Sequence, residues 1–313
     1  MAFDFVEIGD RLRAYRLGEG LTPEAVAKQL GISRGALYNY EKGEVIKLDT
    51  IEKLAQLLKV SIPSLLGVGV EYFSNPVSYF ERKRQLEEKA DRIIVYFEPL
   101  SFVLTSNEYV TVLRKMMVET IPEKYPNRAE ALVRIDRVMK ILENRHAQVW
   151  QRNKNIISLV SAVQVQRVLR SGLIGTYNLS LREREERRAL ARKEVERMAA
   201  LMENEPLGVQ IGVIEEMMPN QTFQIFGARE KTSVAVSPFR LGEFPNISVG
   251  VASITASVDA VALYEKLASD LWSRSYKGAK GAQFLHKLLA ESDPSPTRQS
   301  KSSRNKKSIP LGV

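Results

Sequence analysis

The spacing of apolar residues separates a short helical N-terminal region from a longer region of mixed pattern. Over residues 4–66, apolar positions recur three and four residues apart in five short runs, which is the spacing typical of amphipathic helices. Gly18 and Gly20 follow the first run, and Thr22 and Ser33 precede the second and third, where helix N-caps are expected. The pattern therefore predicts an all-α domain of five helices over residues 1–67.

The segment Pro23–Lys42 has the steric pattern of two helices that cross steeply. Such helices need a small residue where they touch, which is Ala27, and a turn that favours positive φ, which is Gly31. Leu37 lies among the apolar residues that fill the wedge between them. The pattern predicts a helix-turn-helix motif, and a small helical domain that binds another protein is the alternative.

The run LTPEAVAKQLGISRGALYNYEKG, within residues 8–66, resembles the Cro/C1-type helix-turn-helix domain (XRE family, lambda-repressor-like). The resemblance implies that the helix Arg34–Lys42 lies in the major groove of double-stranded DNA. Its exposed N-terminal face would consist of Ser33, Arg34, Gly35, Tyr38 and Asn39. Arg34 would bind guanine O6 and N7, and Asn39 would bind adenine. Lys42, Lys47 and the Thr22 hydroxyl are expected at phosphates.

Two further positions bear on this resemblance. Members of the family often pair an arginine with a glutamate where Arg16 and Glu41 stand here. The resemblance therefore implies a tie between the first helix and the recognition helix, and two separate solvated charges are the alternative. Pro23 stands where the family often has a glutamine that contacts the DNA backbone, so that contact is in doubt, although proline suits a first helical turn.

Beyond residue 67 the sequence predicts a linker over 68–80 and a larger α+β domain over 81–291. Helical periodicity comes first, and residues 151–170 suit either a strand or a helix. Four strands of an antiparallel sheet are then expected at 209–214, 222–226, 233–236 and 247–254, followed by two helices. From residue 292 serine, proline and basic residues dominate, which predicts a disordered basic tail.

The segments FEPLSFVLTSNEYV and VALYEKLASDLW look like parts of the uncharacterised C-terminal domain often fused to Cro/C1-type domains. That resemblance implies no known chemistry. Two roles for residues 81–291 stay open. The region is either a sensor that dimerises the regulator and binds a small-molecule or small-protein effector, or a pure protein-interaction module.

Composition narrows the class of protein without locating the site. The net charge is +9, which favours polyanionic partners. Residues 1–66 nevertheless hold equal numbers of acidic and basic side chains, so the motif and not the charge points to DNA. The chain has no cysteine, which excludes disulfides and thiolate zinc sites. It also lacks an apolar run long enough to span a membrane, and we expect a cytoplasmic protein.

Residues suited to catalysis are scarce. The two histidines, His146 and His286, lie in different segments, and no phosphate-binding loop or nucleophile elbow occurs. We expect no enzyme, no metal and no cofactor. The sequence predicts a sequence-specific transcriptional regulator, a repressor that binds an inverted-repeat operator as a homodimer. An antitoxin-like or phage or plasmid control protein, whose C-terminal domain binds a partner protein, is the alternative.

Overall fold

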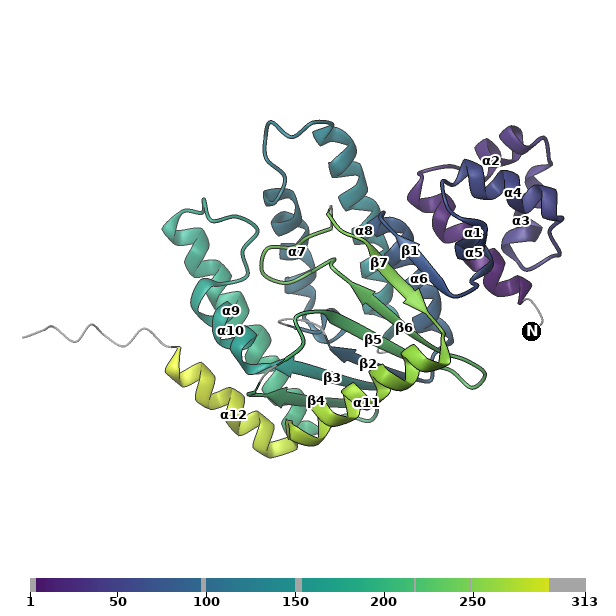
Figure 1. The fold of residues 1–313 in the computed structure, drawn as a ribbon. Helices are drawn as coiled ribbons and strands as arrows, with labels where there is room; N and C mark the ends of the chain where they lie inside the picture. The colour runs from purple at the N-terminus through teal and green to yellow at the C-terminus, as the bar shows by residue number, and fades with distance from the viewer. Residues whose placement is uncertain (1–3, 97–99, 150–153, 217, 248, 293–313) are drawn as a thin grey trace, which may run out of the picture.

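The computed structural model describes residues 4–96, 100–149, 154–216, 218–247 and 249–292 (Figure 1). Its N-terminal part is the predicted five-helix domain. The helices are α1 (Phe5–Gly18), α2 (Pro23–Leu30), α3 (Arg34–Glu41), α4 (Leu48–Leu57) and α5 (Ile62–Leu66). The prediction of an all-α domain at this end of the chain is confirmed.

Local chemistry explains where these helices begin and end. The Asp4 carboxylate accepts hydrogen bonds from the first amides of α1, and the Thr22 and Ser33 hydroxyls do the same for α2 and α3. Each cap satisfies an amide that has no partner within the helix. Gly31 ends α2 with φ of 67°, a conformation that glycine adopts without steric cost.

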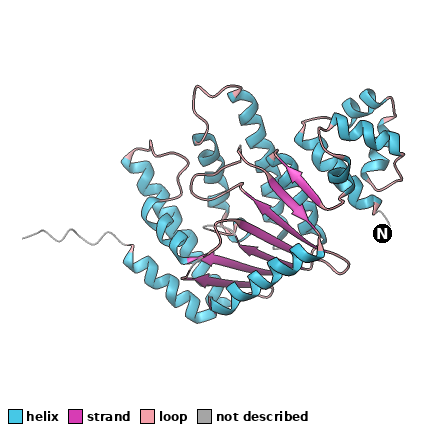
Figure 2. Cartoon of the chain, viewed as in Figure 1, coloured by secondary structure: helices cyan, strands magenta, loops and turns pink. Residues whose placement is uncertain are grey.

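The second region interleaves strands with helices, as Figure 2 shows. Its strands are β1 (Val70–Phe73), β2 (Arg92–Tyr96), β3 (Asn155–Ser161), β4 (Val209–Ile214), β5 (Thr222–Gly227), β6 (Thr232–Ser237), β7 (Ala252–Thr255) and β8 (Tyr276–Lys277). Its helices are α6 (Pro76–Lys89), η1 (Phe102–Leu104), α7 (Asn107–Glu119), α8 (Arg128–Val149), α9 (Ala162–Ser171), α10 (Leu181–Asn204), α11 (Val258–Arg274) and α12 (Gly278–Glu291). The predicted α+β class is confirmed.

The strands form one sheet in the order β1-β7-β6-β5-β2-β3-β4-β8. Most neighbouring strands are antiparallel, as predicted, but β2, β3 and β4 run parallel. Parallel neighbours need crossover connections, and helices supply them between β2 and β3 and between β3 and β4. The sheet is therefore mixed: strands β2 and β3 are each followed by helices that return the chain in the same direction, and the other strands pair antiparallel.

One segment differs from its sequence-based prediction, and a second combines the two alternatives that the sequence left open. Residues 68–80 do not form a separate linker, because β1 pairs with β7, with Val70 opposite Thr255, and α6 already begins at Pro76. A charged residue on the buried face of β1, Glu71, hid the strand pattern from the sequence. The ambiguous stretch 151–170 contains both elements, since β3 passes directly into α9.

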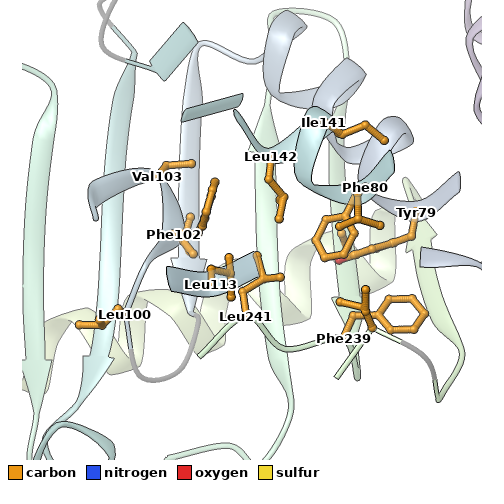
Figure 3. Packing of buried hydrophobic residues seen from close by; sticks show 14 of the residues in the cluster. Tyr79, Phe80, Leu100, Phe102, Val103, Leu113, Ile141, Leu142, Phe239 and Leu241 are labelled. Carbon is orange, nitrogen blue, oxygen red and sulfur yellow. The ribbon is translucent and has the colours of Figure 1, made fainter. Parts of the chain in front are cut away.

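One continuous apolar core joins the two regions. The Tyr15 ring of α1 stacks on Phe73 of β1 at 5.1 Å, and Phe73 contacts Tyr79 of α6. Tyr79 in turn packs against Phe239 at 5.6 Å between centroids, within the cluster of Figure 3. A second, smaller cluster fills the opposite face of the sheet under α11. The helix-turn-helix region thus packs directly against the sheet domain and is not joined to it by a flexible linker alone.

Two expectations concern the ends and the surroundings of the chain. The predicted basic tail lies outside the described residues, apart from Ser292. Among the residues that are described, no helix has both the length and the apolar character needed to cross a bilayer.

Candidate nucleic-acid interface

The crossing of α2 and α3 rests on small and apolar residues. Ala27 is buried where the helices meet, and Val26 and Leu37 are completely buried beneath them. The amide of Ile32 donates to the carbonyl of Ala27 at 3.0 Å and closes the turn at Gly31. The structural roles predicted for these residues agree with this geometry, which presents one side of α3 to solvent.

The solvent side of α3 carries the polar residues that the sequence singled out. Ser33, Arg34, Gly35, Tyr38 and Lys42 are exposed. Asn39 is half-buried, and Thr22 and Lys47 are exposed at the flanks. Contacts bring part of this set together, since Glu24 in the first turn of α2 pairs with Arg34 of α3, and Lys42 lies over the Tyr38 ring.

Several of these side chains already have local partners. The Ser33 and Thr22 hydroxyls accept amide hydrogen bonds at 3.0 and 3.2 Å, and each can still donate its own proton to a phosphate. Lys42 Nζ lies 5.6 Å from the centre of the Tyr38 ring. Arg34 Nε lies 2.8 Å from Glu24 Oε1, in a pair with both side chains exposed. Binding of Arg34 to a base would replace this exposed pair.

Arg16 and Glu41 form the predicted tie between α1 and α3. Arg16 Nε lies 2.5 Å from Glu41 Oε1, and Nη2 lies 3.0 Å from Oε2. The remaining guanidinium nitrogen, Nη1, donates to the Leu21 carbonyl at 2.9 Å. A bidentate pair with little solvent exposure restrains orientation as well as distance. The alternative of two separate solvated charges is wrong.

Gly9 of α1 lies against the backbone of α3, on the side opposite the solvent-exposed face. The sequence interpretation did not identify this residue. A Cβ at Gly9 would fall within 3 Å of the backbone carbonyl oxygens of Tyr40 and Glu41. Helix α1 therefore passes α3 at a distance that only glycine allows. A glycine inside a helix is unfavourable by roughly 0.5–1 kcal/mol relative to alanine. A glycine within the predicted first helix was therefore the sequence feature that could have indicated a close contact with another helix.

The face of α1 that points away from α3 carries a buried ionic cluster, formed by Glu7 and Arg11 of α1, Glu71 of β1, and Arg82 and Lys89 of α6. Arg11 Nε lies 2.7 Å from Glu71 Oε1, and Arg82 Nε lies 3.0 Å from Glu71 Oε2. Arg82 also binds Glu7, and Lys89 binds Glu7. Arg11 and Arg82 are almost fully buried. This ionic cluster joins the helix-turn-helix region to the sheet domain.

The carboxylates of the ionic cluster stay ionised despite their burial. Burial raises the pKa of Glu7, but the Arg82 charge and hydrogen bonds from Lys89 and Arg82 outweigh it, so the pKa is lowered well below its usual range. The pKa of Glu71 is likewise lowered, because Arg82 and Arg11 outweigh desolvation. Buried carboxylates with satisfied cationic partners hold a fixed geometry.

Comparison with known proteins supports the domain that the geometry suggests. A family model described as a helix-turn-helix domain matches residues 7–66. The protein contains a helix-turn-helix domain. This domain supports a role as a DNA-binding regulator. No curated protein and no solved structure matches the chain, and the resemblance noted for the C-terminal segments stays a prediction.

The two histidines lie apart. His146 Nε2 is 2.7 Å from the Thr105 carbonyl oxygen, and His286 Nε2 is 3.0 Å from Glu203 Oε1. Across the described parts of the chain, no three His, Asp or Glu side chains are grouped as metal ligands would be.

Proposed function

We propose that this helix-turn-helix regulator is a repressor that binds an inverted-repeat operator as a homodimer, without catalysing a reaction. The observation that carries the proposal is the exposed polar face of α3, held by Arg16–Glu41 and by the close contact at Gly9. A helix held in this way has a fixed orientation, and its polar side chains reach solvent, where exposed contacts such as Arg34–Glu24 can be exchanged. Both are needed to place Arg34 and Asn39 against base edges in the major groove.

Dimerisation is the role we propose for the second domain. One helix-turn-helix domain reads few base pairs, and joining two domains raises affinity by roughly 10²–10⁴ because the second binding event becomes intramolecular. Helix α11 supplies apolar surface for such a contact, since Val258 and Leu263 are 83% and 69% exposed. A dimer formed through the second domain would set the spacing of two α3 helices.

The same domain has room for a small-molecule effector. A cavity of about 570 Å³ lies beside the start of β3 and β4, and Ile157, Met202 and Trp272 are among its lining residues. Cavities of about 300–1,000 Å³ with mostly apolar walls are typical of ligand sites. A ligand that binds one arrangement of the dimer more tightly would shift the spacing of the recognition helices and hence DNA affinity.

Selection of bound sequences from a random DNA pool tests this function. We expect a symmetric motif with half-sites about one helical turn, roughly 10 base pairs, apart. Arg34→Ala is expected to lose about 1–3 kcal/mol of discrimination at one position in each half-site. An identical motif for Arg34→Ala would contradict the placement of α3. Sedimentation of the full chain as a monomer, both free and on the selected DNA, would contradict the dimer.

A further inference from the structure

Helix α8 of the second domain touches the helix-turn-helix domain at the turn between α1 and α2. The Arg137 guanidinium packs directly on Gly20, where a Cβ would collide with it and where φ is 70°. The turn is fixed from the other side as well, because Asn75 Nδ2 donates to the Gly18 carbonyl at 2.7 Å. The Arg137 guanidinium therefore lies beside the turn that leads into α2.

Among the residues that the structure describes, Arg137 and Lys140 have no acidic partner, unlike their charged neighbours Arg134 and Asp136. Both side chains are exposed, and within the described chain neither forms an ion pair. Nearby charges are already neutralised, since Arg134 pairs with Glu130 at 3.3 Å and Asp136 pairs with Arg114 at 2.7 Å. Residues three apart are neighbours on a helix surface, so Arg137 and Lys140 make one small cationic site.

This cationic site adjoins the proposed DNA surface. Gly20 lies two residues before Thr22, the N-cap of α2, and Glu24 in the first turn of α2 pairs with Arg34 of α3 at 2.8 Å. Arg137 thus lies at the turn before α2, and the first turn of α2 contacts Arg34 of α3. The N-terminus of α2 carries amides without helical partners and the positive end of the helix dipole, which favour a phosphate beside it.

We propose that Arg137, with Lys140, contacts the phosphate backbone of DNA next to the N-terminus of α2. This inference rests on the proposed DNA-binding function and extends the interface onto the second domain. Its chemistry is that of a sequence-independent contact, because an arginine or lysine at a phosphate carries no base information. Its effect is to fix the angle at which the sheet domain stands on the duplex.

The test is the salt dependence of binding to a labelled mixed-sequence duplex of about 30 base pairs, roughly three helical turns. Arg137→Gln keeps much of the side chain that covers Gly20 and removes the charge. We expect a several-fold loss of affinity and a decrease of about 0.9 in the slope of log Kobs against log salt, the value for one lost phosphate contact. Arg137→Lys is expected to restore the slope, which a purely packing role would not predict.

Two controls separate this contact from the rest of the account. Arg188→Ala removes an exposed arginine from α10, on the side of the sheet domain away from the helix-turn-helix helices in Figure 1, and should leave the slope unchanged. Lys42→Ala should lower the slope through the α3 surface itself. A lowered slope for Lys42→Ala with an unchanged slope for Arg137→Gln would overturn the α8 contact and leave the proposed function standing. Unchanged slopes for both would overturn both.

Discussion

The two faces of the helix-turn-helix domain use charge in opposite ways. On the face of α3, Arg34 and Glu24 pair in the open, with side chains 73% and 54% exposed. On the rear face of α1, Arg11 and Arg82 lie almost without solvent between Glu7 and Glu71. Exposed charges exchange partners readily, whereas buried ones do so only at a large desolvation cost. The first face suits binding, and the second suits attachment.

The largest expected effect comes from breaking the rear face. Arg82→Met removes the cation shared by Glu7 and Glu71 and leaves two buried carboxylates short of a partner. We expect a loss of about 3–5 kcal/mol in the free energy of unfolding, the usual cost of orphaning a buried charge. Chemical denaturation measures it, and Arg34→Ala is the matched change on the exposed face. Equal and small decreases in the free energy of unfolding for both variants would contradict the proposed difference between the two faces.

Acid should weaken the ionic cluster on the rear face of α1. The pKa values of Glu7 and Glu71 are lowered in the folded protein, so their contribution to stability is present above the unfolded carboxyl pKa of about 4.3 and is lost as pH falls through the lower folded values. We expect unfolding free energy to decrease below about pH 5. The variant Glu71→Gln should show a shallower decrease, and an identical slope would exclude Glu71 as a source.

A smaller effect is expected from the tie between the two faces. Arg16→Ala and Glu41→Ala should each destabilise the domain, and the double variant should cost less than their sum. Because the pair is bidentate and largely buried, we expect a coupling energy of about 0.5–3 kcal/mol. A double-mutant cycle by thermal or chemical unfolding measures it, and strict additivity would show that the contact contributes nothing.

The smallest effect is expected at the exposed pair itself. Glu24→Gln removes an acidic group from the proposed DNA-binding surface and releases Arg34 from its ion pair. DNA affinity should rise several-fold, while the unfolding free energy stays nearly constant because exposed pairs contribute little to stability. Titration of one duplex with wild type and variant compares them. Weaker binding by the variant would mean that Glu24 positions Arg34 for DNA instead of competing with it.

Sequence patterns predicted local features better than contacts between regions. The caps Thr22 and Ser33, the turn at Gly31 and the Arg16–Glu41 pair follow from short-range chemistry or from a familiar motif, and the structure contains them. The order of the strands did not follow, because β1 finds its partner in β7, far along the chain. Pairing between distant strands depends on tertiary packing that periodicity does not encode.

The buried ionic cluster is a second feature that sequence patterns did not predict. Glu71 and Arg82 look like ordinary surface charges in the sequence, and charged residues are almost never fully buried unless paired. Their partners Glu7 and Arg11 lie some 60 residues away or more and belong to another domain. Nothing in local spacing links them. For this reason residues 68–80 resembled a linker, although they carry the attachment of the helix-turn-helix domain.

Methylation interference on the selected operator tests most directly whether α3 reads the major groove through Arg34. Methylating guanine N7 blocks the atom that the arginine fork would bind. We expect that methylation of one guanine in each half-site inhibits wild-type binding and that Arg34→Ala loses this inhibition while interference elsewhere persists. The same interference pattern in wild type and Arg34→Ala would contradict the account.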